Sequence, residues 1–139
     1  MNDPTRAASP QAASKLALVV DDDPFSQEIF TEMLLSLGVT DIHTAASGRL
    51  GLRALAALPR APDFVICDVY MPDMDGIEFL AELAKRAYQG GVILVSGLDI
   101  TMMAIAQQVA IAEGLKMLGA LTKPVPLAVL AEVMAQADR

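Results

Sequence analysis

Five short apolar runs, separated by longer segments of helical period, constrain the fold of this chain more than any other feature of its sequence. Short apolar runs are typical of buried strands, and apolar residues that recur every three or four positions are typical of helices. Parallel strands need long crossovers, which are usually helical, so this alternation predicts an α/β fold of five βα units. The predicted strands are residues 16–20, 41–45, 64–67, 92–95 and a stretch within 115–122.

The first predicted helix shows how local chemistry marks the ends of these segments. Asp23 suits an N-cap, Pro24 is favoured at a first helical position, and Gly38 favours termination. A spacing of four residues predicts an apolar helix face made of Phe25, Ile29, Met33 and Leu37. Later helices are predicted at residues 47–58, 77–87, 101–113 and 126–137, and the third is expected to face inward with Ile77, Leu80, Ala81 and Ala84.

Length, composition and charge limit the classes of protein to which the chain can belong. With 139 residues, 54% of them hydrophobic, it suits one globular domain, expected at residues 15–139 after a disordered Ala/Ser/Pro-rich tail at residues 1–14. No apolar run is long enough for a membrane span, and the net charge of −7 without a basic stripe argues against direct nucleic-acid binding. A single cysteine, Cys67, cannot form an internal disulfide, so we expect a cytoplasmic location.

Reactive side chains follow four of the predicted strands. Asp21 and Asp22 follow the first strand, Asp68 the third, Ser96 the fourth and Lys123 the fifth. In an open parallel sheet the carboxyl ends of the strands lie along one edge, where ligands bind. Clustered carboxylates repel one another unless a cation neutralises them, and Mg²⁺ prefers oxygen ligands. An aspartate beside such an ion can accept a phosphoryl group, whose oxygens a lysine and a serine hydroxyl would stabilise.

Each of these groups also has a simpler interpretation when it is taken alone. Residues 21–23 suit a solvated turn and helix cap, and Asp73 and Asp75 suit turns. His43, the only histidine, has no metal-binding pattern around it. Asp68 is harder to explain in this way, because it closes an apolar strand, where burial of a charge is unfavourable. The reactive side chains that follow four strands, taken together, therefore favour a phosphoryl-transfer site.

Four segments, in order along the chain, resemble the receiver domains of bacterial two-component response regulators. The resemblance extends from Lys15 to about Ala137. It implies a flavodoxin-like, doubly wound sheet of five parallel strands in the order 2-1-3-4-5. The segments that carry it are residues 18–24 (LVVDDDP), 65–76 (VICDVYMPDMDG), 95–97 (VSG) and 121–124 (LTKP).

The resemblance implies how the phosphoryl group is handled. Asp68 would accept it from a sensor histidine kinase or a phosphotransfer protein, and the domain would catalyse only its own phosphorylation and dephosphorylation rather than act as an enzyme. Ser96 would bond a phosphoryl oxygen. Lys123 would pair with Asp68 at rest and with the phosphoryl group afterwards, and the peptide bond between Lys123 and Pro124 would be cis.

The resemblance also implies the ligands of a magnesium ion. Asp22 and Asp68 would bind Mg²⁺ directly, together with the backbone carbonyl of Tyr70. Asp21 would act mainly through water. Such a site keeps several waters on the ion and binds it weakly.

Two features depart from the usual pattern of this family. Receivers commonly carry an aromatic residue three positions before the lysine, and here that position is Ala120, so no rotamer exchange is expected there. The stretch between Ser96 and Lys123 is longer by about one helical turn, roughly 3.6 residues. Its ending is similar to that of receivers joined to cyclic-di-GMP phosphodiesterase domains.

Two other classes of function remain open on the sequence. Phosphatases of the haloacid dehalogenase type carry an Asp-x-Asp after a first strand, which Asp21 and Asp23 could imitate. That interpretation leaves Asp68 unexplained, and the chain has no room for a substrate cap. A non-phosphorylated module could keep the fold and signal by binding alone, although the complete acceptor set argues against it.

The fourth helix, the fifth strand and the fifth helix are predicted to form the face through which the domain signals. Residues 100–112 contain no charged residue, and residues 126–136 contain only Glu132. A helix exposed to water normally carries charges on its outer face, so a homodimer contact or an output domain is expected here. The residues expected to leave some apolar surface are Met102, Met103, Ala106 and Val109.

Overall fold

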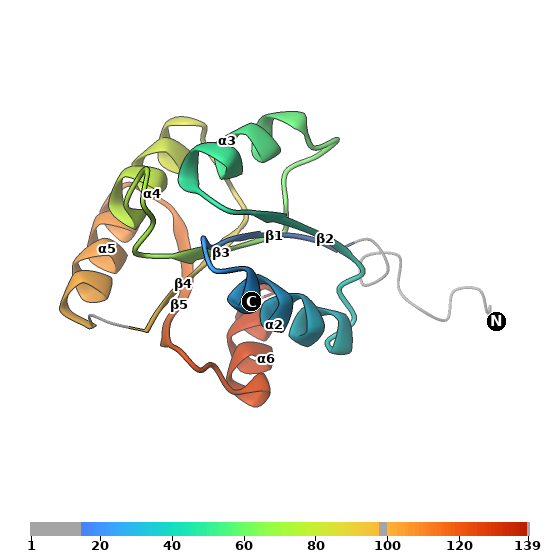
Figure 1. Ribbon diagram of the computed structural model, residues 1–139. Helices are drawn as coiled ribbons and strands as arrows, with labels where there is room; N and C mark the ends of the chain where they lie inside the picture. Colours follow the sequence, from blue (N-terminus) through green and yellow to red (C-terminus); the bar gives the residue numbers. More distant parts are fainter. Residues whose placement is uncertain (1–14, 98–99, 139) are drawn as a thin grey trace.

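The computed structural model describes residues 15–97 and 100–138, which form a sheet covered by helices on both faces (Figure 1). Five parallel strands pair in the order β2-β1-β3-β4-β5. The predicted fold class and the strand order implied by the resemblance are therefore confirmed. The strands are β1 (Leu16–Val20), β2 (Asp41–Ala45), β3 (Phe64–Asp68), β4 (Gly91–Ser96) and β5 (Lys116–Thr122).

The helices divide into two groups, one on each face of the sheet (Figure 1). One face carries α3 (Gly48–Ala57), α4 (Gly76–Lys85) and α5 (Ile100–Ala112), and the other carries α2 (Pro24–Ser36) and α6 (Leu127–Ala135). A short 3₁₀ turn, Gln136–Asp138, follows α6. No described helix is long and apolar enough to cross a membrane. The predicted tail at residues 1–14 lies outside the described residues.

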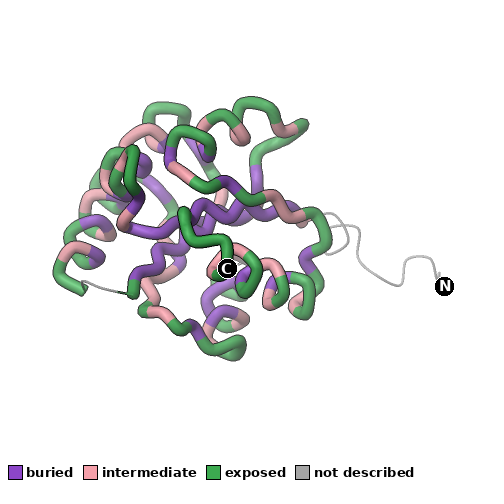
Figure 2. Tube along the Cα trace, viewed as in Figure 1, coloured by how far each residue is buried: buried purple, intermediate pink, exposed green. Residues whose placement is uncertain are grey.

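The sheet separates two hydrophobic cores, one beneath each group of helices. Every residue of β1, β3 and β4 is buried, because helices cover both faces of these central strands (Figure 2). Successive side chains enter opposite cores, so Leu18 packs beneath α3, α4 and α5 whereas Val19 packs beneath α2 and α6. A shift of one residue in strand register would move the side chains of each core to the opposite face of the sheet. Burial therefore fixes the register, and with it the residues that stand at the strand ends.

The predicted apolar face of α2 is confirmed only in part. Met33 and Leu37 pack against the core beneath α2 and α6, but Phe25 and Ile29 do not. Phe25 is 68% exposed and Ile29 is 41% exposed, whereas Phe30 and Leu34 are the buried residues of this helix. A spacing of four residues advances about 40° around a helix at each step, so a row with this spacing winds away from the buried face. The exposed Phe25 instead lies in the first turn of α2, just after the carboxyl end of β1.

The inward face of α4 also differs from the prediction. Leu80 is buried as predicted, but the large side chains beside it in the core are Phe79 and Leu83. The helix ends at Lys85 rather than at Ala87, because Ala87 has a positive φ of 55°. Ile77 and Ala84 are partly buried and pack against this core, as predicted, whereas Ala81 is only partly buried.

Candidate functional site

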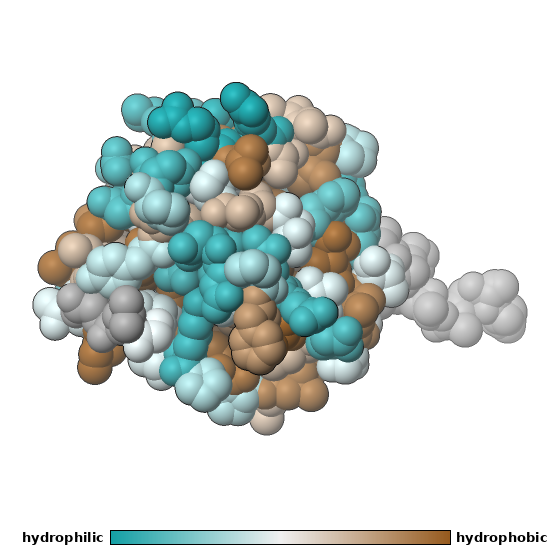
Figure 3. Space-filling model, in the orientation of Figure 1, coloured by the Kyte–Doolittle hydropathy of each residue, from teal (hydrophilic) through white to brown (hydrophobic). Residues whose placement is uncertain are grey.

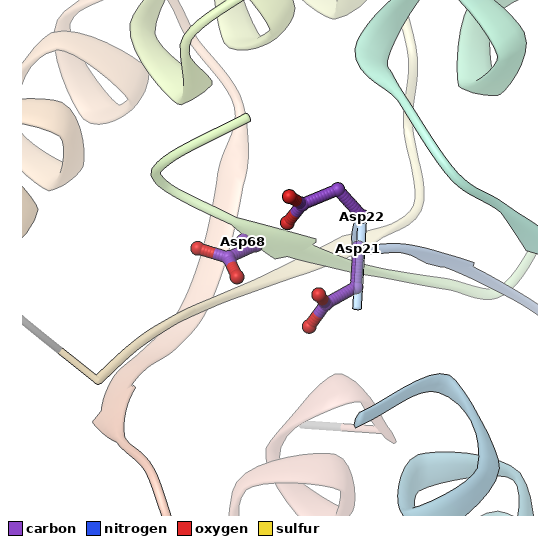
Figure 4. A group of neighbouring side chains, drawn as sticks. All are labelled: Asp21, Asp22 and Asp68. Carbon is purple, nitrogen blue, oxygen red and sulfur yellow. The ribbon is translucent and has the colours of Figure 1, made fainter. Parts of the chain in front are cut away.

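Three carboxylates converge at one edge of the sheet (Figure 4). Asp21 and Asp22 follow β1, and Asp68 ends β3, the strand that pairs with β1. One oxygen from each side chain lies within 4.8 Å of the others. Asp21 and Asp68 are buried, while Asp22 is exposed. The structure therefore brings together the three carboxylates that the sequence places at strand ends.

Lys123 directly follows β5, the outermost strand beside β4, and its side chain extends to this cluster. Its Nζ donates to Asp21 Oδ2 at 2.7 Å and to Asp68 Oδ2 at 2.8 Å. Its backbone N–H donates to the carbonyl of Ser96 at 2.9 Å, which ties the end of β5 to the end of β4. The peptide bond between Lys123 and Pro124 is cis, as expected. The structure thus contains the expected pair of Lys123 with Asp68, and the same ammonium also pairs with Asp21.

One ammonium does not balance the charge of three carboxylates. Burial raises the pKa of Asp21 above its ordinary value, against the opposing hydrogen bonds from Lys123 and from the backbone N–H of Asp23. Burial acts to lower the pKa of Lys123, but its hydrogen bonds to Asp21 and Asp68 outweigh this effect and raise it. The lysine stays charged, and the excess negative charge suits a hard divalent cation bound by oxygen.

Ser96 and Tyr70 lie near Asp68: Ser96 ends the neighbouring strand β4, and Tyr70 follows Asp68 by two residues in the chain. Ser96 is the buried last residue of β4, which pairs with β3. The backbone N–H of Tyr70 donates to Asp68 Oδ1 at 3.0 Å, so the backbone holds one oxygen of Asp68 and Lys123 holds the other. The roles of the Ser96 hydroxyl and the Tyr70 carbonyl stay predictions. Part of the loop after Ser96, residues 98–99, lies outside the described residues.

Asp73 has a structural role that its turn-like sequence does not indicate. Its carboxylate accepts from the backbone N–H of Gly48 at 3.2 Å and of Arg49 at 3.0 Å, at the N-terminus of α3. This contact ties the loop after Asp68 to another helix. Asp75, for which the sequence suggests a turn, is instead the N-cap of α4, in a capping box with Glu78.

We expect Asp73→Asn to lower the free energy of unfolding by about 1 kcal/mol at neutral pH, because it removes a charge from a helix N-terminus. Partial burial acts to raise the pKa of Asp73, but the backbone N–H groups of Arg49 and Gly48 outweigh it and hold this pKa below its ordinary value of 3.8. The stabilisation is therefore present above 3.8 and is lost as the pH falls through the lower folded-state pKa. Urea unfolding should show the wild type and the variant converging toward acid pH. A difference that stays constant with pH would contradict this account.

Ser26, in the first turn of α2, is a second site residue that the sequence does not single out. Lys123 Nζ donates to Ser26 Oγ at 3.3 Å, and the Ser26 hydroxyl donates to Asp23 Oδ2 at 3.2 Å. A serine in a first helical turn is ordinary, so only its contact with Lys123 marks it.

Cys67 and His43 are not members of the acidic cluster. Burial raises the pKa of the Cys67 thiol far above its ordinary value, and the nearby carboxylates Asp68 and Asp21 raise it further, which disfavours the thiolate, the reactive form. His43 lies at the partly exposed edge strand, where its Nε2 is 2.9 Å from Asp41 Oδ1.

The sequence matches the family model described as the response regulator receiver domain over residues 17–135. Among curated proteins, the probable C4-dicarboxylate response regulator DctR of Bacillus subtilis (strain 168) is 40% identical over 80 residues. These residues make up 57% of this chain and 34% of the relative, so the match spans about a third of the relative's length.

Solved structures share the fold. A response regulator receiver domain protein from Clostridium thermocellum has a TM-score of 0.77 at 27% identity, over 88% of this chain and 93% of that one. A chain in the CheX-CheY-BeF3-Mg²⁺ complex from Borrelia burgdorferi has a TM-score of 0.74 at 29% identity, over 88% of both chains.

Proposed function

Because this chain belongs to the family of response regulator receiver domains, we propose that it takes up a phosphoryl group on Asp68 from a sensor histidine kinase or a phosphotransfer protein. The observation that carries this proposal is that Asp68 lies in one cluster with the carboxylates of Asp21 and Asp22 and accepts a hydrogen bond from the Lys123 ammonium. A carboxylate beside a cation site and a lysine is arranged as a nucleophile toward phosphorus.

In the proposed reaction, a carboxylate oxygen of Asp68 forms a bond to phosphorus. The bond from phosphorus to the donor's leaving atom breaks, and that atom keeps the electron pair. The backbone N–H of Tyr70 holds the carboxylate in one orientation, while Lys123 and the Ser96 hydroxyl each donate to a phosphoryl oxygen. Attack by water later releases phosphate and restores Asp68. The domain thus catalyses only its own phosphorylation and dephosphorylation.

The acidic cluster fits a magnesium ion, because three carboxylate oxygens lie within reach of one position. Asp22, Asp68 and the backbone carbonyl of Tyr70 would hold the ion, and Asp21 would act through water. Bound there, the ion would neutralise charge on the transferred oxygens. Among the residues that the structure describes, no basic side chain pairs with Asp22, so its carboxylate is available as a ligand. The similar structure from Borrelia burgdorferi is of a complex that contains BeF3 and Mg²⁺, which supports magnesium as the cation.

The proposed setting is the cytoplasm. Cys67 is buried and unpaired, which fits a reducing compartment. The net charge of −7 disfavours direct contact of this domain with nucleic acid, so any such output would belong to a partner.

Incubation with acetyl phosphate tests the proposed function. The intact mass should rise by one phosphoryl group in the presence of Mg²⁺ and should stay unchanged in excess chelator. Turnover of a general phosphatase substrate that persists in Asp68→Asn would favour the phosphatase alternative. If the protein shows neither phosphoryl uptake nor phosphatase turnover, that result would favour a module that signals by binding alone.

The outer face of α5 is the proposed output surface. Helix α5 has no charged residue, and Ile105 and Ile111 on it are 46% and 58% exposed. Met103 and Ala106 are buried and do not contribute, while Met102 and Val109 are partly buried. We propose that a second copy of the chain covers this face. Two copies that each carry a net charge of −7 repel one another least where their surfaces carry no charge.

We expect Ile105→Glu to weaken this self-association by about tenfold or more, because the new charge would lose its water in an apolar contact. Light scattering at micromolar concentration measures the change. Leu50→Glu on α3 is the matched control, since Leu50 is also 46% exposed and lies on another helix. A monomeric wild type would exclude the second copy, and binding of an output domain that depends on Ile105 would then replace it as the occupant.

A further inference from the structure

The ammonium of Lys123 has a third partner besides the two carboxylates. A lysine ammonium carries three N–H donors. Two of them point to Asp21 Oδ2 at 2.7 Å and Asp68 Oδ2 at 2.8 Å, and Ser26 Oγ lies at 3.3 Å. Since the three acceptors come from the end of β1, the end of β3 and the first turn of α2, they fix the ammonium in three directions.

The hydroxyl of Ser26 is held in the orientation that lets it accept from Lys123. Its own proton is donated to Asp23 Oδ2 at 3.2 Å, so a lone pair remains for the ammonium. Asp23 is itself fixed as the N-cap of α2, because its Oδ1 accepts from the backbone N–H of Phe25 at 3.0 Å. Hydrogen bonds in such a chain polarise and strengthen one another. The N-terminus of α2 is thereby connected to Lys123.

Ser26 differs from the other two acceptors in what happens to it during phosphoryl uptake. Asp68 forms a covalent bond to phosphorus, and both Asp68 and Asp21 face the cation site. Ser26 is neutral and is no part of the acidic cluster, so neither phosphorus nor the cation competes with Lys123 for it. An ammonium that leaves Asp68 Oδ2 to follow a phosphoryl oxygen would still be anchored on one side.

We propose that Ser26 is a positioning residue, which holds the Lys123 ammonium in the place from which it meets the incoming phosphoryl group. The inference rests on the proposed function of Asp68 and Lys123. It assigns to the first turn of α2 a role in the reaction rather than only in helix capping.

The first test measures the contact without any phosphoryl chemistry. In the metal-free protein, ¹⁵N NMR of the lysine ammonium groups reports how fast the Lys123 protons exchange with water. We expect Ser26→Ala to speed this exchange about threefold to tenfold, which corresponds to the loss of one modest hydrogen bond. Ser26→Thr keeps the hydroxyl and should restore the slow exchange. Ser36→Ala, in the last turn of the same helix, is the matched control. Within the described part of the chain, the Ser36 hydroxyl bonds only its own helix, at Met33 O.

The second test measures the reaction with acetyl phosphate and Mg²⁺. Ser26→Ala should lower the rate of uptake by a similar factor, Ser26→Thr should retain it, and Ser36→Ala should match the wild type. Unchanged ammonium exchange in Ser26→Ala would overturn the proposal, and so would faster exchange with unchanged uptake. If the wild type takes up no phosphoryl group, the proposed function fails and the reaction role of Ser26 fails with it. The NMR result would still show whether Ser26 holds Lys123, so the two failures are distinguishable.

Discussion

Replacement of Asp68 by asparagine should abolish magnesium-dependent phosphoryl uptake in a chain that stays folded. A neutral amide does not attack phosphorus as a carboxylate does, so the mass increase with acetyl phosphate should disappear. The fold should persist because the two side chains are nearly isosteric. The amide oxygen can still accept the backbone N–H of Tyr70 that now bonds Asp68 Oδ1.

The electrostatic consequences of Asp68→Asn should partly offset one another. Lys123 would lose one partner but keep Asp21 at 2.7 Å. The charge of Asp68 contributes to the raised pKa of Asp21, after the larger effect of burial, so its removal lets that pKa fall. We therefore expect the free energy of unfolding to change by no more than about 1 kcal/mol.

Asp73→Asn is the matched control for this prediction. It makes the same chemical change a few residues further along the chain, at a side chain that caps α3 and is no member of the acidic cluster. Uptake should be retained in Asp73→Asn and lost in Asp68→Asn. Uptake that persists in Asp68→Asn and maps to another aspartate would refute the assignment of the acceptor.

Asp22→Ala should lower magnesium affinity and the rate of phosphorylation together. Loss of even an indirect partner of a metal ligand typically costs about 10- to 100-fold in affinity, so loss of a direct ligand should cost at least about tenfold. Raising the magnesium concentration should restore part of the rate. The fold should be unaffected, because Asp22 is exposed and lies outside both cores.

A charge-matched control separates coordination from a general effect of charge. Asp41→Ala removes one exposed carboxylate from β2, outside the acidic cluster, and should leave magnesium binding unchanged. Equal losses in the two variants would mean that net charge, rather than Asp22, attracts the ion. Undiminished phosphorylation of the wild type in excess chelator would exclude the metal role altogether.

The order of elements could be predicted from the sequence because strand and helix periods differ, but the buried face of each helix could not always be. In α2, both the row that contains Phe25 and Ile29 and the row that contains Phe30 and Leu34 are apolar at spacing four. Only packing against the sheet decides between them, and it buries Phe30 and Leu34. Periodicity gives the type of an element more securely than its orientation.

The residues of the candidate site also divide into those that could be predicted from the sequence and those that could not. Asp21, Asp68 and Lys123 could be brought together from sequence because the carboxyl ends of parallel strands share one edge. The contacts of Asp73 with α3 and of Ser26 with Lys123 depend on the paths of loops, which no residue pattern specifies. Ala120 is partly buried against the core beneath α3, α4 and α5, and the absence of a ring exchange there stays a prediction.

The reach of Lys123 across the sheet has a consequence for the order in which the domain assembles. Lys123 stands 102 residues after Asp21 and 55 after Asp68. Contacts between residues so far apart in the chain cost loop-closure entropy before they form, so we expect these contacts to close late in folding. Until β5 pairs with β4, the carboxylates at the ends of β1 and β3 repel one another without an ammonium between them. Docking of the last strand removes that repulsion. Synthesis proceeds from the N-terminus, so a nascent chain that extends past Asp68 but not to Lys123 carries the proposed acceptor without the lysine proposed to meet the phosphoryl group.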